Sequence, residues 1–485
     1  MSTVVDRLVV RLEGIVGRDH VVTHPHALRT FESDGLLHHA RVPAVAVLPG
    51  SGAEVHAVVQ TCVAAGVPWV ARGAGTGLSG GALPIEEGVL VVTSRLRRIL
   101  DVDLDDARVI VEPAVTNAAV SSAVGPSHFY PPDPSSQIVC SVGGNVAENS
   151  GGAHCFKYGF TAHYVTGLEV VLGDGSVTWL GGRHADELGP DLVGAFVGSE
   201  GTLGICTQIV LRVVPAPEEV RTFVAFFAST ADAGNAVSEI VSAGVVPGAI
   251  EMMDRLAIEA AEEATGAGYD RTAGAALVVE IDGPRAECEA TLTAVADRCR
   301  ESGATDVRIA ADEAERALIW RARKAAFAAM GRISPAYYVQ DGVIPRTRLA
   351  EVLARIDELA AEFGLRVANV FHAGDGNLHP LICYDGARPG EAERAEQLAG
   401  HILRACIDAG GSITGEHGVG VDKRDAMPWM FDDADLAAFG RLRRAFDPLG
   451  LANPDKVLPT PRLCGEVPGP YRAHPLEAQG VIERW

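Results

Sequence analysis

Short apolar runs alternate with amphipathic stretches along the first part of the chain, and this alternation predicts strands and helices in turn. Residues 44–48 and 67–71 are expected to form buried strands, and residues 53–65 between them a helix that Gly66 ends. These elements make a strand–helix–strand unit. That unit leads directly into a glycine-rich segment at residues 72–82.

A different pattern begins after Pro215-Ala-Pro217, a proline pair that predicts a domain boundary. Strands and helices alternate beyond it, which indicates an α+β fold class with helices on one face of an antiparallel sheet. The expected strands span residues 220–227, 249–253, 275–281, 307–310 and 366–371, and the expected helices span 231–243, 286–300, 312–330, 347–363 and 391–409. Residues 1–17 predict an amphipathic surface helix and not a signal peptide, because charged side chains interrupt their apolar positions.

The composition of the 485 residues predicts a well-packed globular chain with two or more domains. No apolar run approaches the roughly 20 residues that a membrane-spanning helix needs, so no transmembrane segment is expected. The nine cysteines lack Cys-x-x-Cys spacing, which favours reduced thiols in a cytoplasmic protein. A net charge of −22 disfavours nucleic acid as a partner. An anionic substrate would need a local cluster of positive groups.

The glycine-rich segment 72–82 has the composition of a phosphate-binding loop. Glycines let backbone N–H groups approach a ligand closely, and successive N–H groups can form an anion-binding nest. Gly75, Gly77 and Gly80 match the GxGxxG spacing, but a strand expected at 88–92 leaves no room for the helix of a Rossmann fingerprint. A Walker A loop is excluded because the segment contains no lysine.

Two further glycine-rich segments occur at residues 143–152 and 198–205, and a proline-rich turn at 130–137 precedes them. Three glycine-rich segments in one region predict a long polar cofactor threaded between backbone segments. Three unrelated turns are the alternative interpretation.

Histidine and glutamate side chains with ligand character occur late in the chain. His372 and His379 flank a Gly-Asp-Gly turn, and Glu416 could add a carboxylate to make a common ligand set for a divalent metal. Two satisfied core histidines are the alternative. His417 could act as a general base, since the unperturbed pKa of histidine lies near neutrality. Alternatively, His417 is only part of a glycine-flanked turn.

Three cations lie on the predicted helix 312–330. Arg321 and Lys324 are three residues apart, so Arg323 points to another side of the helix. A guanidinium can bind a carboxylate through two hydrogen bonds, which suits an organic acid substrate. A solvated helix face is the alternative interpretation.

Several motifs together resemble those of FAD-linked oxidases of the vanillyl-alcohol oxidase type. They are RGAGTGLSGGA, PPDPSSQ, GGNVAENSGG and GSEGTLG. The segments FHAGDGNLHP and GEHGVG narrow the resemblance to FAD-linked D-2-hydroxyacid dehydrogenases, in the branch of the bacterial glycolate oxidase flavin subunits. This resemblance covers residues 30–465. It implies a two-subdomain FAD-binding domain of the vanillyl-alcohol oxidase (PCMH) type and a cap domain built on an antiparallel sheet.

The resemblance also implies a division of the chain and roles for individual residues. The implied parts are an N-terminal helical segment (1–38), an FAD-binding domain (39–217), a cap domain (218–412), a segment returning to the flavin (413–460) and a tail (461–485). His372, His379 and Glu416 match ligands for Zn, Mn or Fe, His417 matches the base, and Arg323 matches the arginine that binds the substrate carboxylate. Implied FAD contacts are Arg72, Gly73, Ala74, Gly75, Thr76, Gly77, Leu78, Ser79, Pro132, Asp133, Ser136, Gly143, Gly144, Asn145, Asn149, Gly201, Gly204, Ile205, Asn377 and Asn453.

The implied reaction is oxidation of a small D-2-hydroxyacid to the 2-oxoacid, with hydride transfer to flavin N5. Glycolate is the expected substrate. FAD is expected to bind non-covalently, because residues 72–82 contain no histidine or cysteine to which the flavin ring could be attached. Val339 stands where 2-hydroxyglutarate dehydrogenases carry a lysine, which argues against a dicarboxylate substrate. Implied partners are iron–sulfur and second flavin-type subunits of a glycolate oxidase complex, at the inner face of a membrane, with a quinone or another non-oxygen acceptor. The alternatives are a D-lactate dehydrogenase and a non-catalytic FAD-binding subunit.

Overall fold

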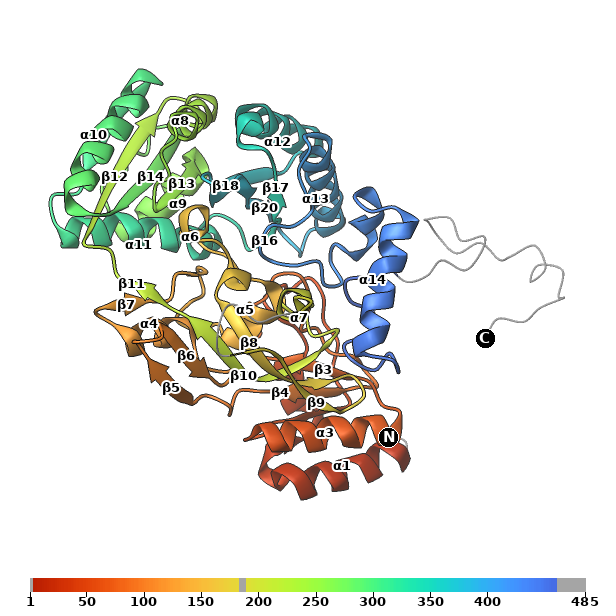
Figure 1. Cartoon of the computed structure of the whole chain (residues 1–485). Coiled ribbons are helices and arrows are strands. Elements are labelled where there is room, and N and C mark those ends of the chain that lie inside the picture. Colours follow the sequence, from red (N-terminus) through yellow and green to blue (C-terminus); the bar gives the residue numbers. More distant parts are fainter. Residues whose placement is uncertain (1–2, 183–188, 460–485) are drawn as a thin grey trace.

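The computed structural model describes residues 3–182 and 189–459, which form sheets of four, five, two and nine strands (Figure 1). Figure 1 shows the nine-stranded sheet and its helices at the top, with the smaller sheets below them. Within the described ranges, no helix is long and apolar enough to cross a membrane. The eight cysteines of these ranges are buried free thiols. The expected tail 461–485 lies outside the described residues.

The first sheet contains the strand that leads into the glycine-rich segment. Its strands, in spatial order, are β1 (Val21–Val22), β2 (Val45–Val47), β4 (Val89–Val92) and β3 (Trp69–Arg72). Strands β2, β4 and β3 run parallel, and α3 (Gly52–Ala65) connects β2 to β3. Ser51 begins α3 by accepting a hydrogen bond from Glu54 N–H, and Gly66 ends it at a φ of 64°. The predicted strand–helix–strand unit is therefore confirmed.

The N-terminal segment adds both helices and a strand to this region. Helix α1 (Thr3–Val16) packs against α3, as Figure 1 shows, and Leu8, Leu12 and Val16 enter the same apolar core as Val55 and Val58 of α3. Strand β1 pairs antiparallel with β2. The segment also contains α2 (Pro25–Leu28).

The second sheet is antiparallel and carries the other two glycine-rich segments at its margins. Its strands, in order, are β5 (Ile99–Asp103), β6 (Arg108–Val111), β10 (Gly204–Arg212), β8 (Val165–Leu172) and β9 (Val177–Gly181). The associated elements are α4 (Asn117–Val124), α5 (Val142–Glu148), α6 (Cys155–Tyr158), α7 (Leu192–Phe196) and the paired strands β7 (His128–Phe129) and β11 (Val214–Pro215). Segment 143–152 includes most of α5, and segment 198–205 leads into β10.

The largest sheet belongs to the second half of the chain and is wholly antiparallel. Its strands are β12 (Glu219–Phe227), β13 (Ala249–Asp254), β14 (Ala275–Gly283), β15 (Ala304–Ile309), β16 (Ala336–Val339), β17 (Gly342–Val343), β18 (Arg366–His372), β19 (Asn377–Leu378) and β20 (Pro380–Tyr384). The main order is β15-β12-β14-β13-β18-β19-β17, and β20 joins β16 to β18. The α+β fold class is confirmed.

Helices cover both faces of this sheet, and the expectation of helices on one face needs correction. One face carries α8 (Thr230–Ser242), α10 (Arg285–Glu301), α12 (Leu349–Phe363) and α13 (Glu391–Asp408), and the other carries α9 (Arg255–Thr265) and α11 (Glu313–Ala329). Alternate residues of β12 show the division, since Phe223 and Phe227 enter one core and Val224 and Phe226 the other. The sequence analysis missed α9, whose buried face is mostly alanine.

The last described segment returns to the first sheet. After α13 the chain makes the turn 412–420 and then forms α14 (Asp433–Phe446), which Figure 1 shows beside the smaller sheets. Trp69 N–H donates to Leu451 O, and Asn453 N–H donates to Trp69 O, so this segment pairs with the start of β3. Short 3₁₀ helices lie at Arg18–His20, Arg29–Phe31, Thr161–His163, Met330–Arg332, Arg346–Arg348 and Arg424–Trp429.

Candidate active site

A cavity of about 590 Å³ lies where the smaller sheets meet the nine-stranded sheet. All three glycine-rich segments line it, together with the turn that follows the proline-rich stretch. Fourteen of the expected cofactor residues lie on its wall: Arg72, Gly73, Ala74, Gly75, Thr76, Gly77, Leu78, Ser136, Gly143, Gly144, Asn145, Gly201, Gly204 and Ile205. Segments far apart in the sequence therefore converge on one concave site, which makes three unrelated turns a poor explanation.

The glycine-rich wall fits a bound dinucleotide for two physical reasons. Gly75 has a φ of 71°, which strains any residue with a side chain, and a Cβ there would also displace the Arg72 guanidinium, 2.3 Å away. Ser199 lines the cavity, and its hydroxyl is buried with no hydrogen-bond partner among the described residues. A polar ligand would satisfy that hydroxyl.

The other expected cofactor residues stand behind the wall and support it. Ser79 O accepts hydrogen bonds from Val421 N–H and Asp422 N–H. The Nδ2 of Asn453 donates to Gly81 O at 2.9 Å and to Glu200 O at 2.6 Å.

Four more expected residues also lie off the wall. Pro132 O accepts from Asn117 Nδ2. The Asp133 carboxylate contacts the His154 ring, and the Asn149 side-chain oxygen accepts from Ala162 N–H. Asn377 is buried, and neither atom of its amide has a hydrogen-bond partner in the described part of the chain.

His372, His379 and Glu416 come together at one end of the cavity. His372 ends β18, His379 lies between β19 and β20, and Glu416 comes from the turn 412–420. Glu416 Oε1 lies 3.2 Å from His372 Nε2 and 3.1 Å from His379 Nε2, and the two imidazole rings are perpendicular at 5.1 Å. These three donors fit a divalent metal, because two imidazole nitrogens and one carboxylate oxygen face a common point.

The charges of this cluster support one another. Burial alone would raise the pKa of Glu416, but His372 and His379 hold it well below its ordinary value. Burial alone would lower the pKa of His372, but Glu251 and Glu416 raise it well above its ordinary value. Glu251 Oε1 lies 2.7 Å from His372 Nδ1, so it fixes the orientation of that ring.

His417 lies beside this cluster, on the cavity wall. Its ring stacks on that of His379 at 4.8 Å and 10°, and its Nε2 is 3.7 Å from Glu416 Oε1. Burial lowers the pKa of His417 to about 4, so the imidazole is neutral at pH 7 and keeps a free lone pair.

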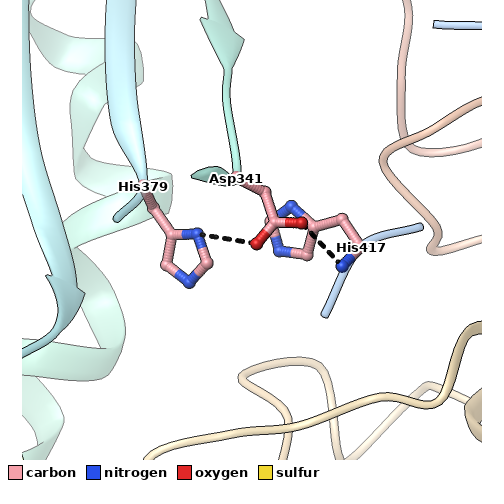
Figure 2. A group of neighbouring side chains, drawn as sticks. All are labelled: Asp341, His379 and His417. Carbon is pink, nitrogen blue, oxygen red and sulfur yellow. Dashed lines mark hydrogen bonds and ion pairs between the residues drawn. The ribbon is translucent and has the colours of Figure 1, made fainter. Parts of the chain in front are cut away.

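Asp341 completes the cluster and was missed by the sequence analysis. Figure 2 shows its carboxylate directed at the ring of His379 and at the backbone of His417. Asp341 Oδ1 is 3.8 Å from His379 Nδ1, and Asp341 Oδ2 accepts from His417 N–H at 2.9 Å. An aspartate between an apolar strand and a glycine, as in YYVQDG, is the local signal that could have drawn attention to it.

Arg323 does not line the cavity. It is 2% exposed, and its Nη2 lies 2.5 Å from Glu251 Oε2. Because Glu251 also contacts His372, Arg323 lies behind His372, at the end of a buried series of ion pairs. The neighbouring Lys324 does line the cavity and makes no ion pair within the described ranges. Phe327, one turn further along α11, lines the same wall and contacts the His379 ring. Val339 contributes an apolar patch nearby.

The fold and the domain matches define an FAD-dependent oxidoreductase. Residues 43–181 match the FAD binding domain family, and residues 216–457 match the C-terminal domain family of FAD linked oxidases. The chain belongs to the FAD-linked oxidase family.

Named relatives narrow the comparison. The chain is 49% identical to glycolate oxidase subunit GlcD of Escherichia coli (strain K12) over 437 residues, which cover 90% of this chain and 88% of that protein. It is 32% identical to a D-lactate dehydrogenase of Anaerostipes hadrus over 425 residues, which cover 86% and 89%. The structure of p-cresol methylhydroxylase with substrate bound shares the fold at a TM-score of 0.80 and 18% identity, covering 95% of this chain and 98% of that one.

Proposed function

We propose that the protein oxidises glycolate, or a similarly small D-2-hydroxyacid, to the 2-oxoacid and passes the electrons to an acceptor other than oxygen. The observation that carries this proposal is the convergence of His379, Glu416 and His417 on the cavity that the glycine-rich segments line. The 49% identity to a glycolate oxidase subunit supports glycolate as the first substrate. The predicted domain boundaries, 39–217 and 218–412, are retained as part of this proposal.

The glycine-rich segments that line the cavity would hold FAD, which would supply the acceptor for the hydride of the substrate C2. His417 takes the hydroxyl proton on a ring nitrogen, because its imidazole is neutral and lies on the wall. His372, His379 and Glu416 would hold a divalent ion, and such an ion would supply the positive charge that lowers the pKa of the substrate hydroxyl. Glu251 and Arg323 hold the His372 ring in place from behind.

The cations of α11 bind the substrate carboxylate. Lys324 reaches the site from the wall, and Arg323 contributes its charge from directly behind it. Arg72, the other lysine or arginine on the described wall, donates to Ser33 O at 2.7 Å. Val339 offers no charge for a second carboxylate, which favours a monocarboxylate substrate.

A substrate screen tests the proposal directly. Purified protein reconstituted with FAD should reduce an artificial dye with glycolate, more slowly with D-lactate, and negligibly with L-lactate or D-2-hydroxyglutarate. Lack of dye reduction with every 2-hydroxyacid would support the non-catalytic flavin subunit instead. The retained His372, His379, Glu416 and His417 argue against that outcome.

D-lactate oxidation is the second candidate. D-lactate dehydrogenases are among the relatives at 30–32% identity, and the apolar wall at Val339 and Phe327 could receive a methyl group. The ratio of kcat/KM for glycolate to that for D-lactate decides between the two. A ratio below one would make D-lactate the physiological substrate.

Partner subunits form the last part of the proposal. The E. coli relative is a glycolate oxidase subunit by name, which supports assembly with iron–sulfur and second flavin-type subunits. Such partners would carry electrons towards a quinone and could hold this chain at the inner face of the membrane. Co-purification from the native host, followed by iron analysis, tests this assembly, and a protein that purifies alone and without iron would contradict it.

A further inference from the structure

The turn that carries Glu416 and His417 has every backbone N–H group from residue 415 to residue 420 engaged by a side chain. Asp341 accepts from Gly415 N–H at 3.0 Å, from Glu416 N–H at 3.3 Å and from His417 N–H at 2.9 Å. The same carboxylate accepts from the Thr414 hydroxyl at 2.5 Å. The first half of the turn is therefore wrapped around one buried carboxylate of the cap.

The second half of the turn is held from the opposite side. Glu200 accepts from Val419 N–H through one oxygen and from Gly420 N–H through the other, both at 2.7 Å. Gly418 N–H donates to the Thr414 hydroxyl at 3.0 Å. Both Glu200 and Asp341 are almost fully buried, so these short hydrogen bonds are shielded from water.

Glu200 belongs to the flavin-binding half of the molecule. It lies in the glycine-rich segment 198–205, lines the cavity and has an unusual positive φ of 52°. Its backbone carbonyl is fixed by Asn453 Nδ2 at 2.6 Å. The adjacent Ser199 hydroxyl faces the cavity side without a partner among the described residues. One residue thus connects the cofactor wall to the turn that presents a metal ligand.

We propose that Glu200 is a positioning residue that couples FAD binding to metal binding at His372, His379 and Glu416. FAD orders segment 198–205, the Glu200 carboxylate then fixes the turn, and the fixed turn presents Glu416 to the metal. By linkage, the metal must strengthen FAD binding by the same factor. This inference rests on the metal site of the proposed function.

Glu148 supplies a matched control. Its carboxyl group also lies under the turn, and a Cβ at Gly418 would lie even closer to a Glu148 oxygen than to a Glu200 oxygen. Glu148 Oε2, however, has no hydrogen-bond partner in the described ranges, whereas both Glu200 oxygens accept from the turn. Glu148→Gln therefore changes a buried carboxyl in the same place without removing a bond to the turn.

The experiment measures Mn²⁺ affinity by calorimetry in the FAD-free and FAD-loaded full-length protein. In the wild type, FAD should raise Mn²⁺ affinity about tenfold, within the 5- to 150-fold usual for coupled sites. Glu200→Gln should reduce this factor to nearly one, whereas Glu148→Gln should keep it. Asp341→Asn should weaken Mn²⁺ binding equally in both forms, because Asp341 holds the turn from the cap.

A merely structural role for Glu200 would lower both affinities and leave their ratio unchanged. Glu200→Asp, which keeps the charge and shortens the reach, should give an intermediate factor, and it replaces the Gln variant if that variant fails to fold. Mn²⁺ binding that is identical with and without FAD in the wild type, or full coupling in Glu200→Gln, would overturn the inference and leave the metal site standing. Absence of Mn²⁺ binding in either form would overturn both.

Discussion

Separate substitutions of the two neighbouring cations of α11, Arg323 and Lys324, should lower kcat/KM in different ways. Lys324 lies on the cavity wall and forms no ion pair among the residues described, whereas Arg323 is 2% exposed and paired with Glu251. Lys324→Met keeps a long apolar stem and removes only the charge. We therefore expect this variant to bind FAD and fold normally but to bind glycolate weakly.

The size of the effect follows from the contact that is lost. A hydrogen bond between a charged donor and a carboxylate is worth about 1.5–3 kcal/mol. At about 1.36 kcal/mol per factor of ten, the loss in kcat/KM is roughly ten- to a hundredfold. It should arise mainly as a higher KM, because the carboxylate is bound alike in the ground state and the transition state.

Arg323→Lys should act in another way. Lysine keeps the charge but loses the planar guanidinium, so its pair with Glu251 must rearrange. Because Glu251 also orients His372, we expect lower kcat, weaker metal retention and roughly a ten- to a hundredfold loss in kcat/KM. FAD binding should change far less than substrate use.

Stopped-flow reduction of the flavin at increasing glycolate concentrations separates these effects. Metal content, FAD content and Tm are measured on the same samples, and Arg321→Met is the control, because Arg321 is exposed on the same helix but does not line the cavity. A wild-type KM in Lys324→Met, together with a raised KM and normal metal content in Arg323→Lys, would refute the reasoning. The substrate carboxylate would then be bound by Arg323 alone.

Three other predictions concern the base, the flavin and the domain contact. His417→Ala should slow flavin reduction about a hundredfold with unchanged metal content, whereas His379→Ala should lose the metal in elemental analysis. Acid precipitation should release all FAD into the supernatant, and a yellow pellet would contradict non-covalent binding. Burial alone would lower the pKa of His154, but Asp133 and Glu280 raise it to about 10 from 6.5. The protonated ring therefore stabilises the fold fully below pH 6.5, and this stability is lost as the pH rises towards 10. Tm should fall more steeply over that range in the wild type than in His154→Gln, and parallel curves would refute this role.

The sequence predicted the elements whose local pattern is strong. The strand–helix–strand unit ending in segment 72–82 formed as expected, because Ser51 and Gly66 bound α3 and the flanking strands are apolar as far as Ala71. Helix α9 was missed because buried alanines give a weak apolar period. That omission left α11 as the only expected helix of the second face, and the sequence did not indicate on which face α11 would pack.

The sequence predicted which side chains form the candidate site but not how they are arranged around the cavity. His372, His379 and Glu416 could be chosen because two imidazoles and a carboxylate form a common metal ligand set, and His417 because histidine suits a general base. The structure brings all four side chains together. Helix periodicity indicated that Arg323 and Lys324 point to different sides. It could not indicate which side meets the cavity, because that depends on how the cap sits on the other sheets.

The glycines of the turn 412–420 show why the residues that contact this turn could not be predicted from the sequence. A Cβ at Gly415 would lie 2.5 Å from the Asn377 amide, and Gly418, at a φ of 86°, would bring a Cβ within 2.8 Å of a Glu200 oxygen. The sequence has glycine at these positions, but the side chains that require it, Asn377 and Glu200, lie 38 and 218 residues away in the sequence. Local pattern thus encodes the shape of the turn, whereas its partners exist only once two domains have met.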